Sequence, residues 1–134
     1  MWNDQYRRGV GFRKEPNRLL VRAAEGVAPG KALDLAMGQG RNALHLASRG
    51  WKVTGVDISD EGIRQARAAA AERNLVLDAV LSDVNDHDFG TARWDLVTMI
   101  YAGADPGWIE RAKVNLKPGG LVRFVARRRR DGIR

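Results

Sequence analysis

The sequence contains no cysteine, and this absence removes several kinds of chemistry at once. Disulfide bonds, thiolate zinc sites and a cysteine nucleophile are all excluded. No apolar run approaches the roughly 18 residues of a membrane-spanning helix, and the first residues lack the apolar stretch of a signal peptide. We therefore expect a cytoplasmic protein that neither spans a membrane nor holds a metal.

Histidine is also scarce, with only His45 and His87 in the chain. Both are candidates for a general base by residue type. His45 falls in an expected helix and His87 in a polar turn, so we expect both side chains at the surface. The sequence thus names no catalytic base.

The 134 residues suffice for one domain with a single core. We take residues 1–134 as that domain, with a leading segment and helix over 1–30 and a basic tail over 127–134. The tail has five arginines and one aspartate, so four of the seven net positive charges lie there. Such a charge block is most often solvated, so nucleic acid is not the expected partner.

Short strand-like runs alternate with longer helix-like runs along the chain, which is typical of an α/β fold built from βαβ units. Asn17, Ser59 and Asp105 are expected to cap helices. The expected helices cover 17–26, 42–49, 59–73 and 105–116. The expected strands cover 31–37, 51–59, 75–83, 94–101 and, after a turn at 117–120, 121–126.

Strands joined by helices pair in parallel, so their carboxyl ends share one edge of the sheet. Asp34 to Gly40, Asp57, Asp83 and Tyr101 all fall at or just beyond those ends. Open α/β sheets bind their ligands there. We therefore expect the functional site at this edge.

A glycine-containing loop, Gly38-Gln39-Gly40, separates the first strand from the following helix. Glycine permits a tight turn and close approach of a ligand, and the helix start offers unpaired N–H groups. One interpretation is an NAD(P)-binding site, because residues 38–43 fit G-x-G-x-x-A and Asp57 follows at a suitable spacing. The acidic Asp34 at the strand end and the bulky Arg41-Asn42 pair count against it.

The stretch ALDLAMGQGRNALHLASRGWKVTGVDIS resembles the first motif and following acidic strand end of class I S-adenosylmethionine-dependent methyltransferases. WNDQYRRGVGFRKEPNRLL resembles the leading segment of their tellurite-resistance and thiopurine-type small-molecule branch. FGTARWDLVTMIY and LKPGGLV resemble their fourth and fifth strands. The resemblance covers about residues 2–126 and implies a doubly wound, mostly parallel five-stranded sheet, order 3-2-1-4-5, with helices on both faces.

The sequence departs from this family pattern in two ways. Ala36 stands where the first loop glycine is usual, and Met37 where a cysteine is common. The family usually adds two more strands after the fifth, so we expect a minimal or truncated form, or a homodimer that covers the fifth-strand edge.

The resemblance implies cofactor contacts from the loop and the three strand ends. Asp34 would take the ammonium side of S-adenosylmethionine, or else cap the loop. Arg41 would pair with the carboxylate, or else be exposed. Asp57 would bind the ribose hydroxyls, or else cap the next helix, and Asp83 would accept from the adenine amino group, or else form a turn. The remaining expected contacts are Ala36, Gly38, Gly40, Asn42, Ile58, Val84 and Ile100.

Methyl transfer from a sulfonium is an in-line displacement, so alignment and exclusion of water carry most of the catalysis. Tyr101, at the fourth strand end, is the candidate on the acceptor side, or else packs in the core or the lid. Trp2, Tyr6 and Phe12 can form a lid over the cofactor, or else cover the sheet. The sequence predicts a methyltransferase acting on a small molecule. A module that binds S-adenosylmethionine without catalysis and an NAD(P)-binding domain remain as alternatives.

Overall fold

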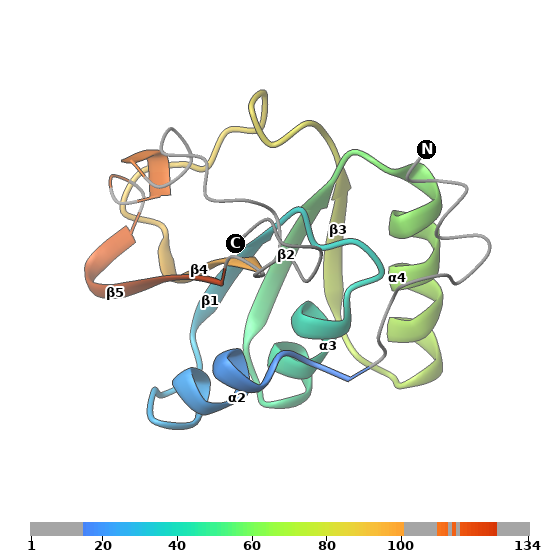
Figure 1. Cartoon of the computed structure of the whole chain (residues 1–134), viewed down its shortest axis with the longest axis horizontal. Helices are drawn as coiled ribbons and strands as arrows, with labels where there is room; N and C mark the ends of the chain where they lie inside the picture. The colour runs from blue at the N-terminus through green and yellow to red at the C-terminus, as the bar shows by residue number, and fades with distance from the viewer. Residues whose placement is uncertain (1–14, 101–109, 113, 115, 126–134) are drawn as a thin grey trace, which may run out of the picture.

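The computed structural model describes residues 15–100, 110–112, 114 and 116–125. These residues form a five-stranded sheet whose neighbouring strands all pair in parallel, in the order β3-β2-β1-β4-β5 (Figure 1). The predicted fold class and strand order are confirmed. The strands are β1 (Lys31–Leu35), β2 (Lys52–Asp57), β3 (Leu77–Leu81), β4 (Trp94–Ile100) and β5 (Leu116–Val125).

Helix α2 (Arg18–Glu25) precedes β1, α3 (Arg41–Ser48) connects β1 to β2, and α4 (Asp60–Glu72) connects β2 to β3. The Asn17 side chain accepts hydrogen bonds from the first N–H groups of α2, and Ser59 accepts one from Gly62 in α4. The predicted N-caps Asn17 and Ser59 are confirmed, and Gly26, the last residue of the predicted range 17–26, is the C-cap of α2. None of the helices formed by the described residues is long and apolar enough to cross a membrane.

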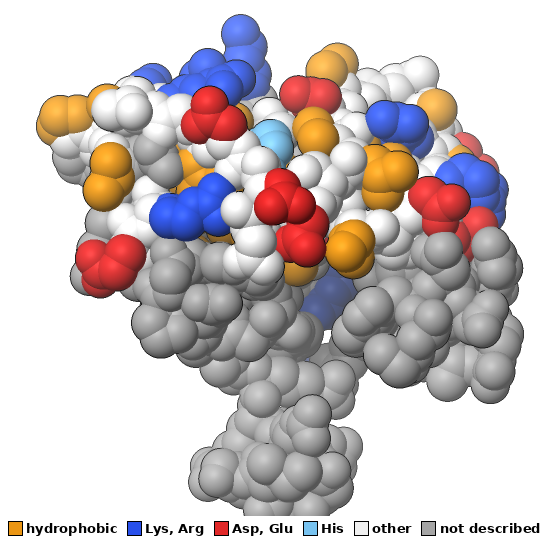
Figure 2. All heavy atoms as spheres, turned by 90° about the horizontal axis from the view of Figure 1, so that it is seen from above, with side chains coloured by type: hydrophobic (Ala, Val, Ile, Leu, Met, Phe, Trp, Pro, Cys, Tyr) orange, Lys and Arg blue, Asp and Glu red, His pale blue; other side chains and the backbone are white. Residues whose placement is uncertain are grey.

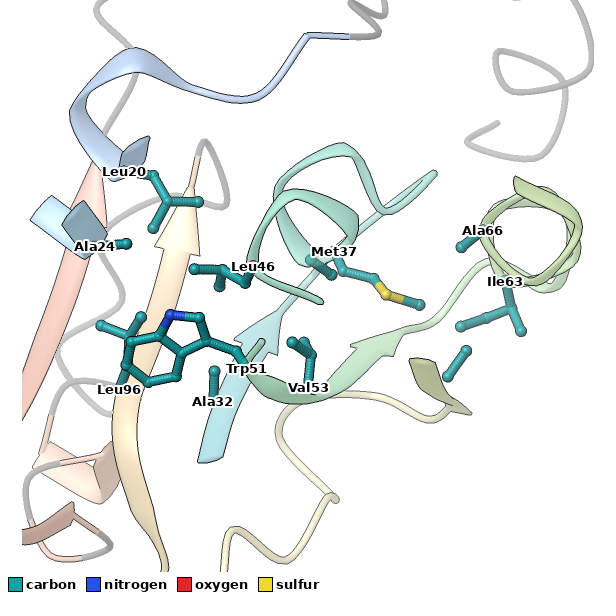
Figure 3. Close-up of a cluster of buried hydrophobic side chains, with 12 residues drawn as sticks. Leu20, Ala24, Ala32, Met37, Leu46, Trp51, Val53, Ile63, Ala66 and Leu96 are labelled. Atoms are coloured by element: carbon teal, nitrogen blue, oxygen red, sulfur yellow. The ribbon is translucent and has the colours of Figure 1, made fainter. Parts of the chain in front are cut away.

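The two faces of the sheet bury separate clusters of apolar side chains. On the first face, strand residues meet α2, α3 and α4, with the thioether of Met37 pointing toward α4 (Figure 3). The labelled members of this first core are Leu20, Ala24, Ala32, Met37, Leu46, Trp51, Val53, Ile63, Ala66 and Leu96. The second core holds Leu33, Leu35, Val56, Val84, Phe89, Trp94, Val97, Met99 and Ala112.

Neighbouring residues of a strand point to opposite faces, which places two polar residues on the first face. In β1, Asp34 lies between Leu33 and Leu35, which both belong to the second core. In β4, Thr98 lies between two second-core residues in the same way. Asp34 and Thr98 are therefore on the helix-covered face, and they are partners in the β1–β4 register.

The predicted helix through Leu116 is wrong at its end. Residues 110–112 and 114 are helical, but Leu116 begins β5 and pairs with Trp94. The next pair is Leu96 with Leu121, so β4 advances by two residues while β5 advances by five. The expected turn at 117–120 is thus an irregularity inside the strand. Proline lacks the N–H that a regular strand pairs, and glycine is common at bulges, so this stretch favours such an irregularity.

Candidate functional site

The loop between β1 and α3 carries three left-handed residues. Ala36 has φ 55°, Gly38 has φ 61° and Gly40 has φ 86°. Glycine adopts this conformation freely, whereas alanine pays about 1–2 kcal/mol for it. The loop therefore keeps a left-handed conformation at Ala36, although this residue has a Cβ atom where the family pattern has glycine.

Asp57, the last residue of β2, joins this loop to the N-cap of α4. Its Oδ2 accepts the N–H of Gly38 at 2.8 Å, and its Oδ1 accepts the N–H of Ser59 at 2.8 Å. A further hydrogen bond between the loop and β2 runs from the Met37 N–H to the backbone O of Val56 (3.0 Å). A carboxylate has about four acceptor positions, so Asp57 retains capacity for ligand hydroxyls. Sequence reasoning missed its loop-holding role, which only the fold brings about.

Asp34 lies in β1, two residues before the first left-handed residue of the loop, and is 2% exposed. Its Oδ1 accepts from the Thr98 hydroxyl at 2.9 Å, while Oδ2 has no hydrogen-bond partner among the described residues. Burial raises the pKa of Asp34 to about 7; the Thr98 bond opposes this rise, Asp57 adds to it and Arg41 opposes it. A perturbed carboxyl at a strand end is a feature of binding sites.

The start of α3 has no side-chain cap, because Gly40 occupies the N-cap position. Arg41 donates from Nη1 to the backbone O of Glu15 at 3.0 Å. Asn42 is buried, and its Oδ1 accepts the N–H of Asn17 at 2.7 Å. Both side chains thus make contacts with the segment before α2, which was not foreseen for either.

Asp83 follows β3 by two residues. Its Oδ1 accepts from the Asn85 backbone (2.9 Å) and side chain (3.1 Å), which forms a local turn. The preceding residue, Ser82, donates its N–H to the backbone O of Asp57 at 2.9 Å. This bond brings the ends of β2 and β3 together, so Asp57 and Asp83 lie at adjacent strand ends.

Figure 2 views the molecule from above and shows acidic, basic and apolar side chains intermingled on this side. Asp34 and Asp57 are both buried. Of the remaining predicted contacts, Ile58 is 62% exposed, and Val84 is buried in the second core. Several predicted residues lie outside the part of the chain that the structure describes: Tyr101, Asp105, the aromatic residues of the leading segment and the basic tail. The same holds for the side chain of Ile100.

Both histidines are half-buried. His45 lies within α3, whereas His87 lies in the loop after β3 and donates its N–H to the backbone O of Asp83 at 3.0 Å. Burial lowers the pKa of both His45 and His87, and neighbouring arginines lower it further. Within the described ranges, no group of three or more His, Cys, Asp or Glu side chains has a metal-binding arrangement.

Residues 32–120, well over half of the chain, match the methyltransferase domain family. The chain belongs to this family. The matched range begins in β1 and includes the glycine loop, Asp57 and Asp83.

Curated relatives align with most of this methyltransferase domain. The "Ubiquinone biosynthesis O-methyltransferase" of Pectobacterium atrosepticum is 36% identical over 119 residues, covering 84% of this chain and 49% of the relative. The "Probable S-adenosyl-L-methionine-dependent methyltransferase TehB" of Haemophilus influenzae is 30% identical over 122 residues (85% and 42%). "Hemagglutinin 1" of Eikenella corrodens is 36% identical over 110 residues (78% and 36%). The chain spans about a third to a half of these relatives.

Solved structures share the fold. TehB from Haemophilus influenzae superposes with a TM-score of 0.73 at 27% identity, covering 81% of this chain and 40% of TehB. A methyltransferase from Geobacter sulfurreducens in complex with S-adenosyl-L-homocysteine superposes with a TM-score of 0.74 at 22% identity, covering 91% and 53%. The second likeness shows the fold alone.

Proposed function

We propose that this chain binds S-adenosylmethionine at the carboxyl edge of its sheet and transfers the methyl group to a small molecule. The observation that carries the proposal is the buried Asp34 carboxyl at the strand end that leads into the left-handed glycine loop, with one oxygen unpartnered among the described residues. The uncapped start of α3 lies at the end of the same loop.

The residues at this edge suit the different parts of the cofactor. The ammonium group complements Asp34, and the N–H groups at the start of α3, with Arg41, complement the carboxylate. Asp57 has acceptor capacity left for the ribose hydroxyls, because its two backbone contacts use only part of it.

We propose that the residues that follow β3 bind the adenine ring. Asp83 can accept from the amino group, the N–H of Val84 can serve the ring, and Ile58 and Ile100 are proposed to flank it. Ile58 is exposed, as an apolar ligand contact requires in the free protein. Gly38 and Gly40 let the backbone approach the methionine portion, with Ala36 and Asn42 completing the loop.

When bound, S-adenosylmethionine supplies an electrophilic methyl group and a neutral thioether leaving group. The chain's own residues bind and orient it and exclude water, which accounts for most of the rate in an in-line transfer. Tyr101 is proposed to contact the acceptor because it directly follows β4 in the chain.

The small-molecule acceptor is supported by the name of the Pectobacterium relative, an O-methyltransferase of ubiquinone biosynthesis. The name of the TehB relative, a probable S-adenosyl-L-methionine-dependent methyltransferase, supports the proposed cofactor. The tellurite-resistance and thiopurine-type branch stays a prediction. A homodimer through β5 is a separate proposal, because β5 is an edge strand of the sheet that the described residues form. The single-domain extent over residues 1–134 and the cytoplasmic location stay predictions.

Calorimetric titration with S-adenosylhomocysteine and with NAD tests the proposal. We expect the first to bind and the second not to bind. Asp34→Asn should weaken binding by about 1–3 kcal/mol, because the charge facing the ammonium group is lost. The exposed Asp78 provides the matched control, and Asp78→Asn should leave the affinity unchanged. Binding of NAD without S-adenosylhomocysteine would contradict the proposal.

A second experiment separates an enzyme from a binding module. Labelled S-adenosylmethionine is supplied with a panel of thiol, halide, chalcogen-oxyanion and amine acceptors. Turnover above the buffer rate is expected with at least one class, whereas binding without turnover would favour the module. Light scattering tests the homodimer, which a monomer at high concentration would contradict.

A further inference from the structure

The hydroxyl group of Thr98 lies between two acceptors and can satisfy only one of them at a time. Thr98 is completely buried in β4. Its Oγ1 is 2.9 Å from Asp34 Oδ1 and 3.5 Å from the backbone O of Leu33. A hydroxyl has one hydrogen to donate but can also accept a hydrogen bond. Whether it donates or accepts therefore depends on the protonation state of its neighbours.

This geometry is compatible with both charge states of Asp34. When the carboxyl is ionised, the Thr98 hydroxyl donates to Asp34 Oδ1. When the carboxyl is neutral, its proton can be donated to Thr98 Oγ1, while the Thr98 hydrogen turns to Leu33 O. Both states keep this buried hydrogen bond, although its direction reverses.

Charged groups from the neighbouring elements act on Asp34. Asp57, at the end of β2, disfavours the ionised form, and Arg41, at the start of α3, favours it. On the β2 side, the register partner of Asp34 is Gly55, which has no side chain to offer. Burial is the largest effect, and it places the pKa of the free carboxyl near 7, where both charge states are populated.

We propose that Thr98 is a positioning residue that reverses its hydrogen bond as Asp34 changes charge, and that binding of the cofactor's ammonium group expels a proton from Asp34. This inference rests on the proposed function. The ammonium group meets the buried Oδ2, which has no hydrogen-bond partner among the described residues, the carboxylic acid becomes a carboxylate, and its proton goes to the buffer. The Thr98 hydroxyl then donates to the new charge.

The experiment is titration calorimetry of the full chain with S-adenosylhomocysteine in buffers of different ionisation enthalpy. At pH 6 we expect close to one proton released per ligand bound, and at pH 8.5 close to none. Affinity should rise with pH over this range, because below its pKa the carboxyl must first lose its proton. The matched ligand control is 5′-methylthioadenosine, which lacks the amino-acid portion and should release no proton.

Variants test the role of Thr98. Thr98→Val removes the hydroxyl and should move the midpoint of proton release upward by about one pH unit, whereas Thr98→Ser should keep it in place. Thr54→Val, on the neighbouring strand β2, is the matched control and should change nothing. The carboxyl carbon shift of Asp34, followed by NMR in the ligand-free protein, should show the same displacement of the pKa.

Each outcome supports or overturns a different statement. Absence of S-adenosylhomocysteine binding would overturn the proposed function and this inference with it. Binding without proton release at pH 6 would overturn only the inference. An unshifted Asp34 titration in Thr98→Val would overturn the role of Thr98. If Thr98→Val does not fold, loss of proton release in Asp34→Asn is the required result, and retained release would overturn the proposal.

Discussion

The side chain of Met37 occupies the space directly over Gly55. A Cβ atom on Gly55 would lie 2.0 Å from Met37 Sδ and 3.0 Å from its Cγ. Met37 is itself buried in the first core, at the turn that begins the glycine loop. The loop therefore depends on the absence of a side chain at this position of β2.

Gly55→Ala should lower the free energy of unfolding by roughly 1–3 kcal/mol, because Met37 must leave its packed position. Urea denaturation measures this change. Gly26→Ala is the matched control, because a Cβ atom there meets nothing within 4 Å and φ is negative. If Met37 is the obstacle, the cost of Gly55→Ala should be smaller in a Met37→Ala background; an equal cost there would contradict this explanation.

Ala36→Gly should stabilise the protein by about 1 kcal/mol. Ala36 has φ 55°, a conformation that disfavours a residue with a Cβ atom. The control is Ala68→Gly on the exposed side of α4, where the same replacement should destabilise by about 1 kcal/mol. Urea midpoints that fall by similar amounts in both variants would show that no strain is stored at Ala36.

Asn42→Ala should destabilise the protein by about 1–3 kcal/mol, because the N–H of Asn17 loses a buried acceptor at 2.7 Å. Thermal unfolding measures the effect. Asn42→Asp keeps an acceptor oxygen at this place and should retain most of the stability. A loss in Asn42→Asp as large as that in Asn42→Ala would assign the effect to packing instead of the hydrogen bond.

The caps Asn17 and Ser59 were predicted because they depend on local patterns, and the parallel pairing because it follows general rules of chain connection. The strand order was predicted from the resemblance to a known family. The end of the last predicted helix was wrong because tertiary pairing recruited Leu116 into β5. Local propensity does not report which partner strand is within reach, so such a boundary depends on the assembled sheet.

The site was predicted in its location but not in its internal contacts. The positions of Asp34, Asp57 and Asp83 follow from where parallel strands end. The Asp57 bonds to the loop and the Thr98 bond to Asp34 join residues 19 and 64 positions apart, and no spacing rule predicts them. Thr98 could have been found as a polar residue within the apolar run of β4.

The buried Asp34 carboxyl should make stability fall as the pH rises. Its pKa is about 7 in the folded chain, against the usual 3.8 that an unfolded chain approaches. Between these values the unfolded state has lost the proton and the folded state keeps it, so rising pH favours unfolding until the folded-state pKa is passed. The full loss amounts to at most about 4 kcal/mol.

Asp34→Asn removes the ionisable carboxyl, and with it the loss of stability at high pH. The variant should therefore be more stable than the parent chain at pH 8, with little difference at pH 4. Urea denaturation at both pH values measures it, and the difference between the two proteins cancels the contributions of His45 and His87. The same variant is expected to bind S-adenosylhomocysteine more weakly, so Asp34 would lower stability in favour of a charge that the ligand needs. A difference in stability that is the same at both pH values would contradict the raised pKa.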